Sequence, residues 1–125
     1  MSVPVVLMLA LAGGLGAGSR FVLDGAVRAR TRMTLPVGTL IINVSGSLLL
    51  GLLAGLVLVH RLPLDVQAIA GTGFLGGYTT FSTASVETVR LIQSGRPGTG
   101  VLNAVGTMVM ALGAAAAGLA VGLSI

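Results

Sequence analysis

The stretch from Gly71 to Ser85, GTGFLGGYTTFSTAS, most constrains how this chain can fold. It lies within an apolar segment, Val66–Ile92, that is long enough to cross a bilayer as a helix. Four glycines interrupt it, however, and each lowers helix stability by about 1 kcal/mol relative to alanine. Non-helical backbone survives at membrane depth only against protein or a water-filled cavity, and transport proteins bind ions at such breaks. The stretch predicts a transmembrane helix broken near its middle at an ion site; the alternative is a small-residue packing face.

Composition indicates an integral membrane protein. Of the 125 residues, 54% are apolar and only 8% are charged, whereas a soluble domain has about a quarter charged residues. The absence of cysteine excludes disulfides and thiolate metal sites. A pI near 11.6 would suggest a nucleic-acid partner in a soluble protein. Here the arginines lie at the ends of apolar segments, where they set orientation and contact headgroups, so we expect the lipid bilayer and no nucleic acid as partner.

Four segments have the length and polarity of transmembrane helices, and they are Val3–Leu23, Val37–Val59, Val66–Ile92 and Thr99–Ser124. The short linkers between them contain Pro36, Pro63 and Pro97, each near the start of a helix, where proline is tolerated. An even number of spans places both termini on one side. We therefore predict a single all-α transmembrane domain over residues 1–125, in the cell membrane.

The first segment combines a packing motif with a charged end. Gly14 and Gly18 form a GxxxG pair, and Gly13 and Ala17 add a small-xxx-small pair, which together favour close helix packing. Arg20 has Asp24 one turn later as its expected ion-pair partner. Arg20 either holds an anion at a pore mouth or extends to the headgroups, and its position favours the second interpretation.

The second and fourth segments each offer a polar stripe. Asn43 shares a face with Thr39 and Gly46, and its amide is costly in hydrocarbon unless it is hydrogen-bonded. Asn43 therefore faces either a pore or a neighbouring helix, and the sequence does not choose between them. In the fourth segment, Asn103 and Thr107 are four residues apart and face the same way.

Three motifs together resemble the Fluc (CrcB) fluoride channel family. They are GGLGAGSR in the first segment, PVGTLIINVSGSLLLG in the second, and GTGFLGGYTTFST followed by Glu87 in the third. The resemblance covers most of the chain in order and spacing, and the TTFST block is its most specific part. It implies an antiparallel dimer of four-helix subunits, with two fluoride pores along the interface and a buried structural sodium ion at the centre.

The resemblance also implies roles for individual residues. The positions that match pore or vestibule residues of the family are Arg20, Asn43, Phe81, Ser82, Thr83, Asn103 and Thr107. The backbone carbonyls of Gly76 and Thr79 match the sodium ligands. Where the family usually has a second phenylalanine this chain has Ala84, which implies that one of the two pores is impaired or completed differently. Tyr78 replaces a usual aliphatic residue.

The expected function is passive export of cytoplasmic fluoride. Fluoride is small and strongly hydrated, so a pore must replace its water with amide and hydroxyl donors, which favour anions. No nucleotide motif or mid-membrane acid offers an energy source, so passive flow is the simplest interpretation. We expect a channel and not an enzyme. One alternative is a small proton-coupled multidrug transporter, but the first segment lacks the acid that such proteins need. The other is a membrane assembly subunit that transports nothing.

Charge bias predicts a fixed orientation. The first and third loops have six arginines at or near their ends, namely Arg20, Arg28, Arg30, Arg32, Arg90 and Arg96. The second loop and the termini have Arg61 alone. Since cytoplasmic loops carry the excess of arginine, the first and third loops should be cytoplasmic. A subunit that inserts in both directions should have balanced charges, so we favour an oppositely oriented homologous partner over a homodimer.

Overall fold

The computed structural model describes residues 2–31 and 35–125, and these residues form helices and short connections without strands. The helices α1 (Val3–Arg30), α2 (Val37–Leu58) and α6 (Pro97–Ser124) are long and apolar enough to cross a membrane. The all-helical fold class and three of the predicted spans are thus confirmed. Between α2 and α6 the chain forms four shorter elements, which are α3 (Leu64–Val66), the π-helix η1 (Gln67–Leu75), α4 (Gly76–Tyr78) and α5 (Phe81–Gln93).

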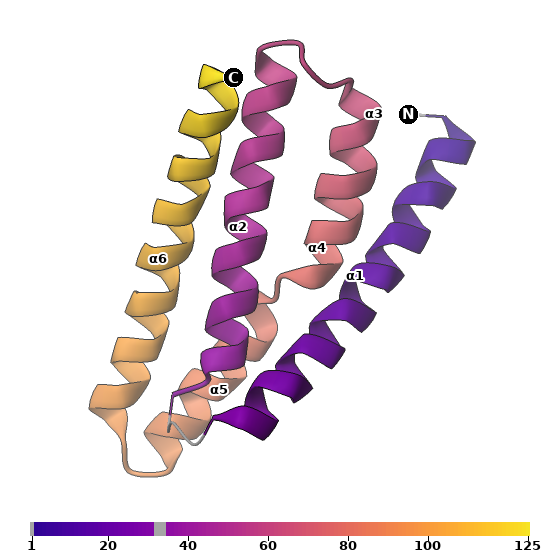
Figure 1. Cartoon of the computed structure of the whole chain (residues 1–125). Helices are drawn as coiled ribbons and strands as arrows, with labels where there is room; N and C mark the ends of the chain where they lie inside the picture. The colour runs from indigo at the N-terminus through magenta and orange to yellow at the C-terminus, as the bar shows by residue number, and fades with distance from the viewer. Residues whose placement is uncertain (1, 32–34) are drawn as a thin grey trace.

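The helices begin where the prolines predict. Pro36 and Pro63 are the N-caps of α2 and α3, and Pro97 is the first residue of α6. Figure 1 shows both termini and the α2–α3 connection at one end of the molecule, with the α5–α6 turn at the other. This agrees with the prediction that the termini share a side. The helix α1 continues to Arg30, past its predicted end at Leu23.

Glycines bring α2 and α6 into backbone contact. A Cβ atom at Gly51 would lie 2.1 Å from the carbonyl oxygen of Ala115, and one at Gly118 would lie 2.1 Å from that of Leu48. Real Cβ atoms do not approach backbone so closely. The two helices therefore pack closely against each other, and Figure 1 shows them side by side.

The same device joins α1 to the segment that follows α3. A Cβ atom at Gly16 would lie 2.0 Å from the carbonyl oxygen of Phe74, and one at Gly77 would lie 2.1 Å from that of Gly13. The predicted GxxxG pair is not used within the chain, because Gly14 and Gly18 face open space. Of the predicted packing residues, Gly13 is in close contact with Gly77, whereas Gly14 and Gly18 are not in contact with the described residues.

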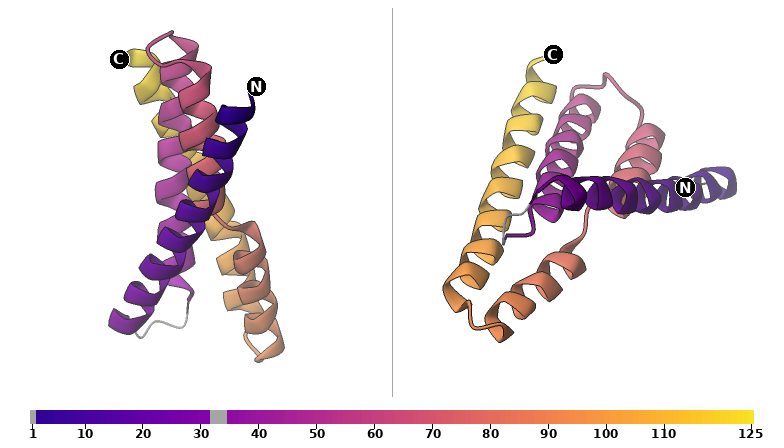
Figure 2. Two further views of the ribbon diagram at one scale, coloured as in Figure 1. Left: turned by 90° about the vertical axis from the view of Figure 1, so that its right-hand side faces the viewer. Right: turned by 60° about the horizontal axis from the view of Figure 1, so that its bottom comes forward.

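The two halves of the third apolar segment pack on different helices. The π-helix η1 and α4 lie along α1, whereas α5 lies beside the first half of α6 (Figure 2). Among the described residues only Ile42 and Leu75 are buried apolar side chains of the core. Most large apolar side chains point outward instead, as expected where lipid is the solvent.

Candidate functional site

The backbone between α4 and α5 is extended at Thr79 and Thr80. Their φ and ψ angles are −80° and 156° at Thr79, and −148° and 115° at Thr80. The N–H of Thr79 still donates to the carbonyl of Leu75 at 2.9 Å, as in a helix. The N–H of Thr80 does not continue this pattern. The chain therefore leaves the helix for two residues, Thr79 and Thr80, between α4 and α5.

Asn43 supplies the hydrogen bonds that the extended backbone loses. Its Oδ1 accepts from the N–H of Thr80 at 2.8 Å, and its Nδ2 donates to the carbonyl of Thr80 at 2.9 Å. Asn43 is only 8% exposed, and Thr80 is buried as well. The side-chain amide of Asn43 thus binds both the N–H and the C=O of Thr80. Its role in this structure is a hydrogen bond between helices.

Thr80 in turn begins α5 as its N-cap. Its Oγ1 accepts from the N–H of Thr83 at 3.1 Å and donates to Oγ1 of Thr83 at 3.1 Å. It also lies 3.3 Å from Oγ of Ser82. The structure therefore places the predicted pore hydroxyls Ser82 and Thr83 in the capping turn of α5.

Two carbonyls at the break lose their helical donors. In an uninterrupted helix the N–H of Thr80 would donate to Gly76, and that of Thr83 would donate to Thr79. Here the first donates to Asn43 and the second to the Thr80 side chain. The carbonyl oxygens of Gly76 and Thr79 are left to accept from elsewhere. Backbone carbonyls that lack their helical donors suit a monovalent cation, so Gly76 and Thr79 fit the sodium ligands that the resemblance implies.

A groove of about 630 Å³ opens beside the break, between α2, α5 and α6. Of the residues predicted as functional, it brings together Asn43, Thr79, Phe81 and Thr107. Asn103 is buried next to it and donates to Oγ1 of Thr88, which lines the groove, at 2.9 Å. The groove thus gathers polar groups from the second, third and fourth apolar segments around the ring of Phe81.

Hydroxyls in this groove differ in whether their protons are free. Ser85 donates to the carbonyl of Phe81 and Thr88 to that of Ala84, both at 2.9 Å, so these protons are already used. The hydroxyls of Ser47 and Thr107 make no hydrogen bond among the described residues. Ser47 escaped the sequence analysis, although its position one turn after Asn43 on an uncharged helix could have indicated it.

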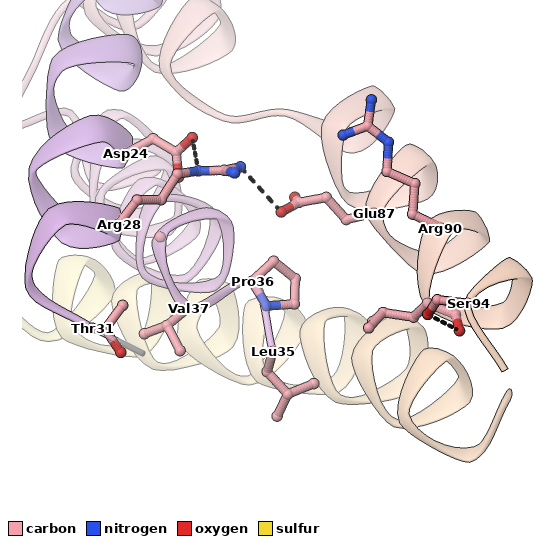
Figure 3. A pocket seen from close by; sticks show the side chains of 11 residues that line it. Asp24, Arg28, Thr31, Leu35, Pro36, Val37, Glu87, Arg90 and Ser94 are labelled. Carbon is pink, nitrogen blue, oxygen red and sulfur yellow. Dashed lines mark hydrogen bonds and ion pairs between the residues drawn. The ribbon is translucent and has the colours of Figure 1, made fainter. Parts of the chain in front are cut away.

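A second cavity, of about 370 Å³, lies at the end of the molecule where α5 turns into α6 (Figure 3). Nε of Arg28 pairs with Oδ2 of Asp24 at 2.9 Å, and Nη2 of Arg28 with Oε2 of Glu87 at 3.3 Å. Oγ1 of Thr39 donates to Oε1 of Glu87 at 2.5 Å. Side chains from α1, α2 and α5 therefore meet here in one network, and both acids are paired.

This network corrects the prediction for Arg20. The expected ion pair between Arg20 and Asp24 is wrong, because Asp24 pairs with Arg28 on the next turn instead. Both spacings are four residues, so the sequence pattern does not distinguish them. Arg20 is half-buried on α1 and lines neither cavity.

Comparison with known proteins places these features in a family. Residues 7–119 match the family described as CrcB-like protein, Camphor Resistance (CrcB). The chain is 56% identical over 118 residues to "Fluoride-specific ion channel FluC 1" of Leifsonia xyli subsp. xyli, covering 94% of this chain and 86% of that protein.

Two further relatives extend the likeness. "Fluoride-specific ion channel FluC 2" of Cutibacterium acnes is 47% identical over 94% of this chain and 96% of its own length. The protein of the same name from Mycobacterium tuberculosis is 42% identical over 94% of this chain and 90% of its own length. With three helices able to cross a bilayer, the chain is a multi-pass cell-membrane protein. Its match over residues 7–119 and its identity to these relatives show that it belongs to the CrcB family.

Proposed function

We propose that this chain is a subunit of a passive, fluoride-selective channel that lets fluoride leave the cytoplasm. The relatives' names support fluoride as the ion. The observation that carries the proposal is the groove beside the break, where the hydroxyls of Ser47 and Thr107 have no partner among the described residues and Phe81 is 87% exposed. As a channel subunit the chain is not an enzyme.

The groove offers donors in an otherwise apolar setting. Stripping water from fluoride is costly, so its path must supply replacement donors. Ser47 and Thr107 each have a hydroxyl proton to give, and Asn43 keeps one of its two amide protons, since only the other is needed for Thr80. The electropositive edge of the Phe81 ring can add a weaker contact. Donor-lined paths favour anions over cations.

The hydrogen bonds of Glu87 support passive flow over proton-coupled exchange. Glu87 lies in the segment that we propose as a third span, Val66–Ile92, broken at Thr79 and Thr80. Its carboxylate is already held by Arg28 and Thr39. An acid that exchanges protons with a substrate must be free to change partners, and this one is bound on both oxygens. A proton-coupled exchanger therefore has less support than a channel.

The carbonyl oxygens of Gly76 and Thr79 would hold a structural sodium ion. Such an ion would supply positive charge beside the groove without an arginine in the path. Oxygen ligands from backbone are what an alkali cation prefers at a helix break. The protein must keep the carbonyls of Gly76 and Thr79 from accepting helical hydrogen bonds. The bonds that Asn43 and Thr80 accept from the N–H groups of Thr80 and Thr83 do this.

We further propose that an oppositely oriented homologous subunit covers the groove. The groove is open along one side, and Phe81 would otherwise present its ring to lipid. Figure 1 places the end of α1 and the α5–α6 turn at one end of the molecule and the α2–α3 connection at the other. Arg28 and Arg30 lie in the last turn of α1, Arg90 in the last turn of α5 and Arg96 at the N-cap of α6, while Arg32 lies outside the described residues. Arg61, which follows α2, donates to the carbonyl of Ile125 at 2.9 Å. This imbalance favours one insertion direction and hence a heterodimer.

Reconstitution into liposomes tests the proposal. Vesicles loaded with fluoride, chloride or a drug cation should release only fluoride quickly, from the chain alone or with its homologous partner. Phe81→Ile should slow fluoride release, while Phe21→Ile, at a residue 81% exposed on α1, serves as the matched control. Equal fluoride and chloride efflux, or drug uptake driven by a pH gradient, would sink the fluoride channel.

The partner is tested separately. Paired cytoplasmic and periplasmic reporters on the C-terminus of the lone chain should show a single orientation, with the C-terminus outside. Comparable signals from both reporters, together with fluoride flux from the lone chain, would support the homodimer instead.

A further inference from the structure

One turn of α2 lies directly under the break. A Cβ atom at Gly46 would lie 2.3 Å from Cγ2 of Thr79 and 3.2 Å from Cδ2 of Tyr78. The missing side chain of Gly46 therefore makes the space that the Thr79 methyl group and the Tyr78 ring occupy. The last residue of α4 and the first extended residue are both seated on α2 at this point.

The side chain of Tyr78 is held both by its hydroxyl group and by the face of its ring. Its hydroxyl lies 3.0 Å from Oγ of Ser45. Because Ser45 donates its own proton to the carbonyl of Ile42 at 3.2 Å, Tyr78 is the donor in this bond. The ring also stacks on Phe74, with centroids 6.2 Å apart and planes 15° apart. An aliphatic side chain at this position could make neither contact.

Thr79 is consequently held from both directions. Downstream, Asn43 fixes the backbone of Thr80. Upstream, the hydroxyl bond to Ser45 and the stack on Phe74 fix Tyr78. Neither Tyr78 nor Ser45 lines the groove. We therefore expect these two side chains to affect ions through the backbone at Thr79 and not through contact with fluoride in the groove.

We propose that Tyr78 and Ser45 form a positioning pair, which orients the carbonyls of Gly76 and Thr79 for a cation. This inference rests on the sodium site of the proposed function. Cation binding by backbone carbonyls depends on their convergence. The Tyr78–Thr79 peptide lies between the peptide groups that carry the carbonyls of Gly76 and Thr79, so a tilt there would turn the two carbonyls relative to each other. Without the hydroxyl bond, the ring can slide on Gly46 and the peptide can tilt.

The experiment uses Tyr78→Phe, Ser45→Ala and the double variant in the assembled channel. Tyr78→Phe keeps the ring and its stack and removes only the donor. Each single variant should raise the sodium concentration for half-maximal stabilisation against heat by about fivefold, the size expected for one hydrogen bond. The double variant should match the single ones, since both remove the same bond. Ser124→Ala, at an exposed hydroxyl at the end of α6, is the control.

Two measurements separate the possible results. Thermal melting with sodium or with a large organic cation reports binding, and fluoride release at the same sodium concentrations reports function. If the parent shows no sodium dependence in either, the sodium site fails and this inference is overturned with it. If the parent responds to sodium but the variants respond identically, the channel and its sodium stand and only the positioning role is overturned. Additive effects in the double variant would likewise refute a pair.

Discussion

Replacing Asn43 by leucine tests what holds the break open. Leucine has the same branched arrangement of side-chain heavy atoms as asparagine but can neither donate nor accept, so the N–H and C=O of Thr80 lose the partners that they have at 2.8 and 2.9 Å. Thr80 is 7% exposed, and an unsatisfied buried polar group costs about 1–3 kcal/mol. For two groups the expected loss in free energy of unfolding is about 2–6 kcal/mol.

The average interhelical hydrogen bond in membrane proteins gives a smaller figure. Interhelical hydrogen bonds there average about 0.6 kcal/mol, because freed groups find new partners. Two such bonds would give about 1 kcal/mol. At Thr80 the extended backbone points its groups away from its own helix, so replacement partners are few. We therefore expect at least about 2 kcal/mol.

The assay is reversible unfolding of the purified protein in mixed micelles, followed by circular dichroism. Leu49→Ala, on the exposed side of α2, is the control for an altered α2 surface. A loss below about 1 kcal/mol with parental fluoride flux would refute the argument that Asn43 holds the break. A large loss of stability with parental flux per folded channel would instead show that Asn43 does not contact fluoride.

Three further outcomes are expected. Phe81→Ile should lower fluoride flux at least tenfold while the assembly persists on size-exclusion chromatography, whereas Phe21→Ile should leave flux unchanged; the tenfold figure assumes a loss of about 1.4 kcal/mol at the barrier. Ser47→Ala and Thr107→Val should each reduce flux without changing the melting temperature, because neither hydroxyl is bonded among the described residues; parental flux in both would exclude them from the path. Gly118→Val should prevent folding into the membrane, measured as lost detergent-stable protein, because its side chain would meet the carbonyl oxygen of Leu48; normal yield would contradict the rigid packing of α2 and α6.

Hydropathy and helix breakers predicted the coarse architecture well. Span limits follow from how much apolar sequence a bilayer needs, and the prolines mark helix starts because they lack an N–H. The small residues were harder to interpret. Gly14 and Gly18 have the packing spacing but face open space, whereas the contacts are made by Gly13, which the pattern also indicated, and by Gly16, which it did not. All four lie within two turns, and only the position of the neighbouring segment decides which face is used.

The polar residues of the candidate site were found by type, but their partners were not. Residue type indicated that Asn43 needs a hydrogen bond, and the structure shows that its partner is the backbone of Thr80. That partner lies 37 residues away, so no local pattern points to it. Tyr78 had no explanation from the sequence, because its hydroxyl partner Ser45 lies on another helix. The proposed fluoride and sodium sites stay predictions.

The elements η1 and α4 pack on α1, whereas α5 packs on α6. The two extended residues that connect them, Thr79 and Thr80, are therefore placed as a hinge. The rigid α2–α6 pair carries α5, and α1 carries the other half of the segment. We expect a tilt of α1 against that pair to be taken up at Thr79 and Thr80, because the helical hydrogen-bond pattern ends at the N–H of Thr79 and only the amide of Asn43 holds the backbone of Thr80. A change in bilayer thickness or lateral pressure that tilts α1 would therefore bend the chain first at the residues that lie beside the groove.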